Sequence, residues 1–358
     1  MSAAYATFAL APATRAGAVL ADGGYQVHRD FVDFVVDGRP LLFRLADLDA
    51  VSPLASDVPP AIFTAQVRAL LLEAEPPLPD GRFVLYGCPE CADLACGAVT
   101  AVIERDGDDY VWRDFAWQTG EHADLERDGY HGMGPFRFHG PGYRAALAAL
   151  AGDAGGPPAP RRVLLVGARV AVLARLAAAL RGIGMGADIT QDATAVPAGE
   201  LRGYGAVFFG PTVGGAERAA VRRAFEHAGA EVACVDGLAP IVPLLVAQIE
   251  HALDRSPLPR RRLTALAAAG TAADLEVASP CRVRVTAYRY GRLHRTRAQE
   301  VFDGILEPGR HRVPLGAGAA PGRSFVVART SGSVLVEPVT PGDPGSARGT
   351  RRARHGDH

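Results

Sequence analysis

The stretch RRVLLVGARVAVLARLAAALRGIGMGADIT, residues 161 to 190, decides how the middle of this chain folds. It begins with an apolar run that is too short for a helix and ends at Gly167. One stripe of the helix expected next holds Leu173, Leu176, Leu180 and Ile183. The alternation continues to residue 254, where the runs AVFFG and EVACVDG are each followed by a helical pattern. Strands alternating with helices of this length predict a parallel sheet with right-handed crossovers.

The predicted layer at 161–254 is similar to the Rossmann and flavodoxin folds, which bind ligands at the carboxyl ends of their strands. On that resemblance, the candidate cofactor-binding residues are Gly167, Arg169, Gly210, Asp236 and Gly237. A dinucleotide fold needs three glycines, G-x-G-x-x-G, after the first strand, and this chain has only the first of them. We therefore expect ordinary NAD(P) binding to be disfavoured, although the fold still allows another nucleotide.

A structural interpretation of the same strand end is open. Asp236 can cap the helix that follows, and Pro240 suits the first turn of that helix. Under this interpretation the VDGLAPIVP segment, residues 235 to 243, starts a helix and does not bind a ligand.

The stretch LYGCPECADLACGAV, residues 85 to 99, holds three of the five cysteines of the chain, Cys88, Cys91 and Cys96. A tight turn with the spacing C-x2-C-x4-C can aim thiolates at one tetrahedral zinc ion. The spacing resembles the opening of a CCHC zinc knuckle, whose histidine would fall on Ala101. The fourth ligand would therefore be Asp93, His122, His131 or a water molecule.

Two other interpretations of these cysteines stay open. The sequence Cys88-Pro-Glu-Cys91 after RFVLY is similar to the opening of glutaredoxins, a resemblance that implies a nucleophilic cysteine activated by a helix N-terminus. Residues 98 to 104 have the pattern of a strand, however, and not of a helix. The third interpretation is that all three are buried or free thiols.

The first 150 residues predict an α+β domain. The Asp37-Gly38 pair between apolar runs indicates a hairpin, and a helix is expected from Pro60 to Ala74. The runs RFVLY, AVTAVIE and YVWRDFAW predict a three-stranded meander. The cysteines lie between its first two strands and therefore occupy a β-corner of this domain.

Two segments rich in proline, glycine or arginine, at 151–160 and 255–262, are typical of linkers, and they divide the 358 residues into three domains. Short strand-like runs between 263 and 338 predict a β-sandwich. The Pro-Gly turn before an edge strand in LEPGRHRVPL makes this segment similar to small Ig-like accessory domains. The tail at 339–358 has little apolar surface and is expected to be disordered.

Charge is divided unevenly along the chain. Residues 1–150 carry 21 acidic and 11 basic side chains, a net charge of −10, and residues 151–358 carry 18 and 27, a net charge of +9. In CRVRVTAYRY, residues 281 to 290, arginine and tyrosine share one face of a predicted strand. We expect this face to dock on the acidic N-terminal domain, within one chain or between two, and we expect no nucleic-acid partner.

The chain has no basic region before its first apolar stretch and no apolar run long enough for a membrane span, so a cytoplasmic location is expected. All of its Lys and Arg positions hold arginine, and asparagine is absent, as expected for a GC-rich genome. The overall pattern resembles multidomain proteins of GC-rich actinobacteria, a resemblance that implies no activity. The sequence thus predicts a zinc-braced binding or scaffold protein, and the alternative is an oxidoreductase-like enzyme that binds a nucleotide in its middle domain.

Overall fold

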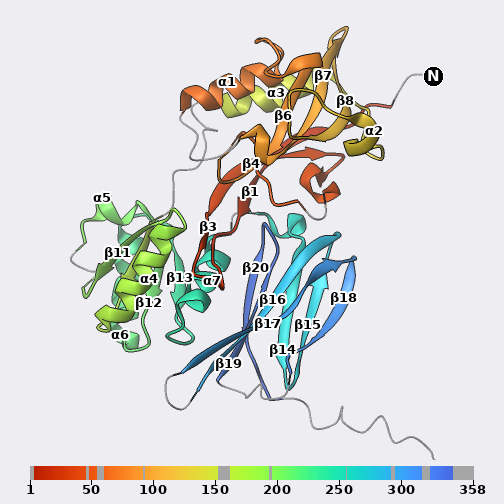
Figure 1. Ribbon diagram of the computed structural model, residues 1–358. Helices are drawn as coiled ribbons and strands as arrows, with labels where there is room; N and C mark the ends of the chain where they lie inside the picture. Colours follow the sequence, from red (N-terminus) through yellow and green to blue (C-terminus); the bar gives the residue numbers. More distant parts are fainter. Residues whose placement is uncertain are drawn as a thin grey trace, which may run out of the picture.

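The computed structural model describes residues 4–45, 48–54, 60–91, 93–151, 162–192, 196–254, 256–291, 295–316 and 323–341. It is a mixed α/β structure with one parallel sheet and several antiparallel sheets (Figure 1). The linker predicted at 151–160 and the tail predicted at 339–358 lie almost wholly outside the described residues.

The N-terminal part begins with an antiparallel sheet of β1 (Phe8–Arg15), β4 (Arg29–Val36) and β5 (Arg39–Pro40). Between β4 and β5, Asp37 and Gly38 have φ angles of 51° and 74°. Two consecutive residues with positive φ form the two-residue turn that matches the twist of a hairpin. The predicted hairpin is therefore confirmed, whereas β1 was not expected.

A second antiparallel sheet has the order β6 (Arg82–Gly87), β7 (Ala98–Asp106), β8 (Asp109–Gln118) and β9 (Phe136–Phe138). Its first three strands are the predicted meander. The helices of this part are α1 (Pro60–Leu70), α2 (Leu125–Asp128) and α3 (Gly140–Ala151). The first helix ends at Leu70 and not at Ala74, because Leu72 adopts a positive φ of 57°.

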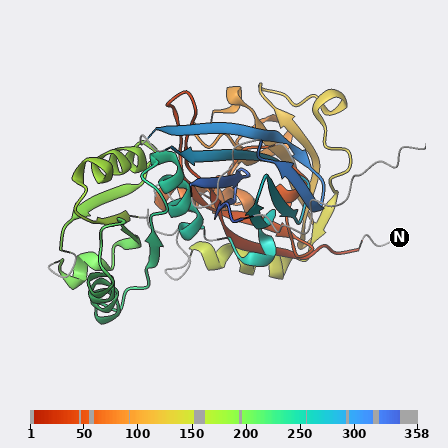
Figure 2. The same ribbon diagram turned by 90° about the horizontal axis from the view of Figure 1, so that it is seen from below.

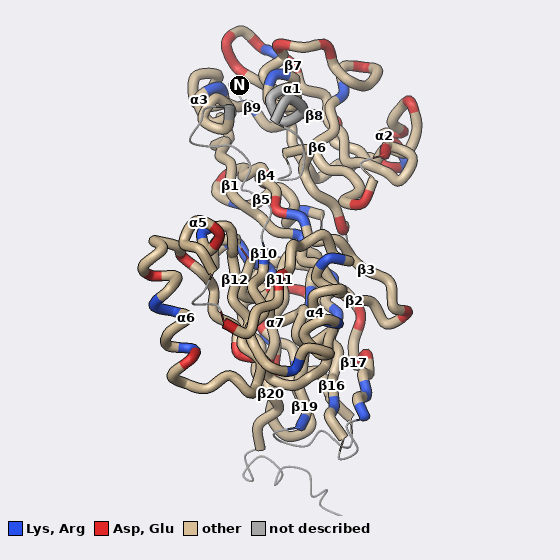
Figure 3. Tube along the Cα trace, turned by 90° about the vertical axis from the view of Figure 1, so that its left-hand side faces the viewer, with Lys and Arg blue, Asp and Glu red and all other residues tan. Residues whose placement is uncertain are grey.

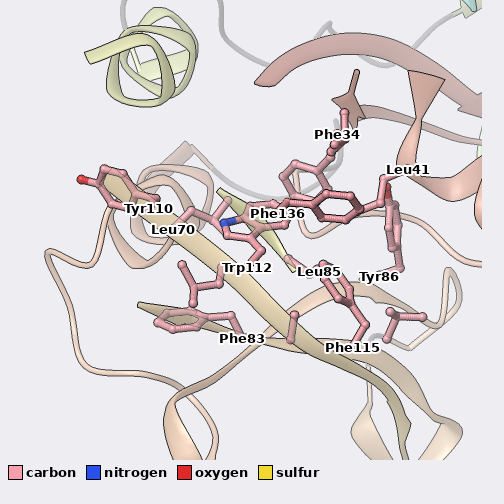
Figure 4. Packing of buried hydrophobic residues seen from close by; sticks show 14 of the residues in the cluster. Phe34, Leu41, Leu70, Phe83, Leu85, Tyr86, Tyr110, Trp112, Phe115 and Phe136 are labelled. Atoms are coloured by element: carbon pink, nitrogen blue, oxygen red, sulfur yellow. The ribbon is translucent and has the colours of Figure 1, made fainter. Parts of the chain in front are cut away.

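Both N-terminal sheets contribute to one aromatic core (Figure 4). The ring of Phe34 on β4 lies 5.3 Å from that of Trp112 on β8, nearly perpendicular to it. The indole N–H of Trp112 donates to the hydroxyl of Tyr143 on α3 (3.2 Å), which donates in turn to the carbonyl of Leu70 (2.9 Å). Buried polar groups of large aromatic residues thus find partners, as they must away from water.

The middle part alternates strands and helices as predicted. Its elements are β10 (Arg162–Val166), α4 (Val170–Gly182), β11 (Gly186–Thr190), α5 (Ala198–Leu201), β12 (Tyr204–Phe209), α6 (Gly215–His227), β13 (Ala233–Asp236) and α7 (Val242–Leu253). The strands pair in parallel in the order β11-β10-β12-β13. The predicted stripe of α4 is buried in a core shared with α7, and α6 packs in a separate core.

The C-terminal part has two antiparallel sheets that share one core. One sheet has the order β14 (Leu263–Ala269), β15 (Ala272–Val277), β18 (Gly309–Pro314). The other has the order β17 (Thr296–Leu306), β16 (Cys281–Tyr290), β19 (Ser324–Arg329), β20 (Val334–Pro338). Sequence analysis missed β14 because its run LTALAAA is rich in alanine, which favours helices.

A small hairpin of β2 (Ala18–Val19) and β3 (Tyr25–Gln26) leaves the N-terminal part and lies beside the other two parts (Figures 1 and 2). Val19 packs against the core between α4 and α7. Across from it, the backbone N–H of Ala16 donates to the carbonyl of Ser331 at 3.0 Å. The segment around residues 13 to 31 is therefore where all three parts of the chain meet.

Candidate metal centre

The three clustered cysteines lie in the loop that joins β6 to β7. Cys88 directly follows β6, Cys91 lies in the next turn, and Cys96 ends the short 3-10 helix η3 (Leu94–Cys96). Their three sulfur atoms lie within 4.8 Å of one another, and the sulfurs of Cys91 and Cys96 are 3.3 Å apart. The structure thus brings together the cysteines that the sequence grouped.

Backbone donors and a neighbouring sulfur shift the pKa values of two of these thiols, Cys88 and Cys96. Burial acts to raise the pKa of Cys88, but the backbone N–H groups of Cys91 and Glu90 bring that pKa below its ordinary value. The adjacent sulfur of Cys91 raises the pKa of Cys96 to about 11. Crowded thiols resist carrying several negative charges together, and a bound cation removes that conflict by holding them as thiolates.

The fourth ligand is not assigned by the fold. Asp93 and His131 are outside the group of close ligand atoms found among the described residues. The Asp93 carboxylate accepts the backbone N–H of Ala95 at 2.8 Å and so caps η3. His122 contacts Asp80, with 3.2 Å between Nδ1 and Oδ2. Because Cys91 and Cys96 are exposed, water can reach the open side of the cluster.

The end of the cysteine loop depends on a glycine. Gly97 has a φ of 98°, in the region that favours glycine. A Cβ atom at this position would lie 1.9 Å from the ring of Trp117. The chain can therefore pass from Cys96 into β7 only with glycine at position 97.

The start of the loop is anchored to the segment where the three parts meet. Arg29 donates to the carbonyl of Pro89 at 2.8 Å, and Arg15 donates to the carboxylate of Glu90 at 2.7 Å. Arg15 also forms a two-pronged pair with Asp49, at 3.0 and 2.7 Å, and only 5% of its side chain is exposed. The position of the cysteine loop is thus coupled to the path of residues 15 to 29.

The loop does not have the helix that the glutaredoxin resemblance implies. Between residue 93 and β7, which begins at Ala98, the chain forms only the short 3-10 turn η3. The helix N-terminus that activates the first cysteine in such enzymes has no counterpart at Cys88, whose pKa is lowered instead by the backbone N–H groups of the turn.

The strand edge of the middle part holds most of the residues proposed for a cofactor. Gly167, Arg169, Gly210 and Gly237 line one shallow apolar hollow with Pro240 and neighbouring residues. Its free volume is about 20 Å³, which is room for a single water molecule. A nucleotide cannot enter this arrangement without movement of the surrounding loops.

Asp236 departs from both interpretations of this strand end. It does not line the hollow, and its carboxylate accepts a 2.7 Å hydrogen bond from Arg218 on α6. The helix that Asp236 was expected to cap begins only at Val242, with Ile241 at its N-cap. The capping role predicted for Asp236 and the first-turn role predicted for Pro240 are therefore wrong, and Pro243 occupies the first turn instead.

A buried charge cluster at the junction of the three parts was missed by sequence analysis. His28 Nδ1 lies 2.7 Å from Glu250 Oε2 on α7, and His28 Nε2 lies 3.5 Å from Asp30 Oδ1. The Asp30 carboxylate also accepts the hydroxyl of Thr14 at 2.8 Å. His28 and Glu250 are 222 positions apart, so no local pattern can relate them.

Burial acts to lower the pKa of His28, but the carboxylates of Glu250 and Asp30 outweigh burial and raise that pKa to about 10. The charge of Glu250 also acts on Arg329 of β19, whose pKa burial lowers. His28 is thus a buried cation that joins the N-terminal part to α7, and a second buried cation brings in β19.

No family model, curated protein or solved structure matches this chain. No helix within the described ranges is both long and apolar enough to cross a membrane.

Proposed function

We propose that this protein is a metal-braced multidomain binding protein in which Cys88, Cys91 and Cys96 hold one zinc ion. The observation that carries the proposal is the approach of the three sulfurs to within 4.8 Å. Thiolates bound to one tetrahedral zinc at about 2.3 Å lie about 3.8 Å from each other. Small side-chain adjustments therefore suffice to bring all three onto one ion.

The role of the ion in this proposal is structural. It would fix the loop whose Pro89 carbonyl and Glu90 carboxylate receive Arg29 and Arg15. Since those arginines flank the hairpin beside α7, the ion would stabilise the junction as well as the β6–β7 corner. Because Cys91 and Cys96 are exposed, a water could complete the coordination beside the three thiolates.

The rival function is a dithiol couple. The separation of 3.3 Å between the sulfurs of Cys91 and Cys96 favours it, since a small movement would allow a disulfide. The two functions differ in the effect of oxidation. Oxidation of the thiolates of a structural zinc site releases the metal, whereas oxidation of a redox couple forms a disulfide and involves no metal.

The test is metal analysis of the purified protein, followed by replacement with Co(II). We expect about one zinc per chain and thiolate-to-Co(II) charge-transfer bands in the substituted protein. Cys88→Ser should abolish the bands, and Cys234→Ser, at an exposed cysteine far along the sequence on β13, should leave them unchanged. A metal-free protein that gives no thiolate-to-Co(II) bands when Co(II) is added would refute the proposal.

We also infer three domains, at 1–150, 161–254 and 263–338. The parallel order β11-β10-β12-β13 supports a Rossmann-like or flavodoxin-like middle domain, and the three-plus-four arrangement of the last sheets supports an Ig-like sandwich.

Docking of the first domain on the third is part of this inference. It is supported by the donation from Arg329 to the carbonyl of Gly17 at 2.8 Å and by that from Arg262 to the carbonyl of Leu42. Arg282 and Arg284, by contrast, pair with acidic residues of their own sheet. Solution scattering tests the docking: reversing Arg329 to Glu should expand the particle, and an unchanged profile would contradict the docking.

A further inference from the structure

A cleft of about 650 Å³ separates the β2–β3 hairpin from the outer face of the sheet that contains β16, β17 and β19. Cavities that bind small organic molecules generally have about 300–1,000 Å³. The cleft is far larger than the hollow at the strand edge of the middle part. Figure 3 shows the arginine positions, in blue, along β16 and β17, which are labelled below β2 and β3.

One wall of the cleft is a regular row along β16. Arg282, Arg284, Thr286 and Tyr288 alternate along the strand, and all four line the cleft. The intervening Val283, Val285 and Ala287 are buried in the core between the two C-terminal sheets. Because successive side chains of a strand point to opposite faces of the sheet, these four polar residues share the face that lines the cleft.

Of the carboxylates that line the cleft within the described residues, three are paired with arginine, and Asp22 of the hairpin segment accepts the backbone N–H of Gly24 at 2.9 Å. Asp303 on β17 accepts from Arg282 at 2.8 Å and from Arg284 at 3.2 Å, and Glu300 pairs with Arg284 at 3.2 Å. Asp49 is held by Arg15. The guanidinium of Arg284 has five N–H donors, and its pairs with Asp303 and Glu300 leave some of these donors over.

Hydroxyl groups add further unused donors. Within the described part of the chain, the side-chain hydroxyls of Thr286, Tyr288 and Ser331 have no hydrogen-bond partner, and all three residues line the cleft. Arg329, also in the lining, donates through Nη1 to the carbonyl of Gly17. The β16 side of the cleft therefore offers more unused donors than free acceptors.

The opposite wall combines apolar side chains with a few polar ones. Its apolar side chains include Val19 and Leu20 of the hairpin segment, Leu48, and Pro243 at the start of α7, and the polar ones are Asp22, Gln26 and Asp49. A ligand that fills the cleft must therefore place an apolar portion on this side and hydrogen-bond acceptors on the β16 side.

We propose that the cleft binds an amphipathic organic anion, whose carboxylate or phosphate is held by Arg284, Thr286 and Tyr288 and whose apolar portion packs against the hairpin. Anionic acceptors form the strongest hydrogen bonds with guanidinium donors, and the hydroxyls complete the site. This site is separate from the metal centre and does not depend on it.

The binding test uses the fluorescence of anilinonaphthalene sulfonate, an anion with an apolar body. We expect saturable binding that octyl phosphate or octanoate displaces and that octylammonium does not. A stronger effect of the phosphate or of the carboxylate identifies the headgroup. Displacement by all three compounds alike would show that the apolar portion alone is recognised and would overturn the proposal.

Variants locate the site. Arg284→Gln should weaken probe binding about tenfold, and Tyr288→Phe about threefold to fivefold, as expected for the loss of a charged and of a neutral hydrogen bond. Glu300→Gln should tighten binding, because it frees Arg284 for the ligand, and a folding defect would not produce that gain. The matched control is Arg312→Gln, whose exposed guanidinium pairs with Asp274 on the other sheet.

Arg169→Gln distinguishes this cleft from the hollow at the strand edge of the middle part. The proposal expects it to bind the probe as the unaltered protein does. Loss of binding in Arg169→Gln with full binding in Arg284→Gln would place the ligand at the strand edge and refute the assignment. Equal losses in Arg284→Gln and Arg312→Gln would show that only the net charge matters, which would also overturn it.

Discussion

Replacing His28 by alanine removes the cation that Glu250 and Asp30 hold inside the junction of the three parts. The Glu250 carboxylate, 2.7 Å from the imidazole, would stay buried without that partner. Breaking a buried ion pair by removing one member costs about 3–5 kcal/mol. We therefore expect His28→Ala to lower the free energy of unfolding by about that amount at pH 7.

The pH dependence gives an independent estimate. The folded protein raises the pKa of His28 from 6.5 to about 10, which corresponds to roughly 5 kcal/mol. In this window the folded state keeps a proton that the unfolded state has lost, so stability falls as the pH rises. The contribution is complete below pH 6.5 and is lost as the pH passes about 10. The groups facing His28 are Glu250, Asp30 and, through Glu250, Arg329.

The assay is urea unfolding of the unaltered protein and His28→Ala at several values from pH 6 to pH 10. The unaltered protein should lose stability across this range, and the variant should lose much less. A double variant, His28→Gln with Glu250→Gln, should regain part of the loss at pH 7, because it leaves no unpaired carboxylate at position 250. A variant within about 1 kcal/mol of the unaltered protein, with the same pH profile, would refute the reasoning.

Two further predictions concern the N-terminal part. Gly97→Ala should lower the free energy of unfolding by about 2 kcal/mol or more, because it combines a positive φ with a clash against Trp117. Thermal unfolding measures this loss. A variant as stable as the parent would contradict the role given to this glycine. Burial raises the pKa of Asp33 to about 7, although the hydrogen bond from Tyr86 (2.5 Å) and the charge of Arg262 act to lower it. The free energy of unfolding should therefore fall by up to about 4 kcal/mol as the pH rises from 4 to 7. Asp33→Asn should remove that pH dependence. An unchanged pH dependence in the variant would contradict the role given to Asp33.

The candidate metal centre was predictable because its ligands are close in sequence. With two and four residues between them, Cys88, Cys91 and Cys96 can separate only a little in space, and a β-corner brings their sulfurs together. The fourth ligand was not predictable, since it depends on which distant loop approaches the corner. Asp93 was a reasonable candidate, but its carboxylate caps the 3-10 turn instead.

The cleft illustrates a mixed case. The alternation of Arg282, Arg284 and Tyr288 with small apolar residues predicted one polar face of β16, and the burial of Val283 and Val285 agrees with it. What faces that polar row could not be read from the strand. The partners of the two arginines come from β17, and the opposite wall comes from a hairpin more than 250 positions earlier in the chain.

By itself, the sequence determined the elements with strong local patterns. The apolar stripe of α4, the turn at Asp37 and Gly38, the meander and the alternation of strands and helices at 162–253 all depend on neighbours within a few residues, where periodicity and turn chemistry decide. In β14, alanine occupies positions where strands commonly have β-branched residues, so the local pattern did not predict a strand. Only the tertiary structure decided the strand order β11-β10-β12-β13, the pairing of His28 with Glu250 and the ion pairs of Arg15 with Asp49 and Glu90. All of these join residues that are far apart in sequence, and the ion pairs form because the buried side chains of His28 and Arg15 need charged or polar partners.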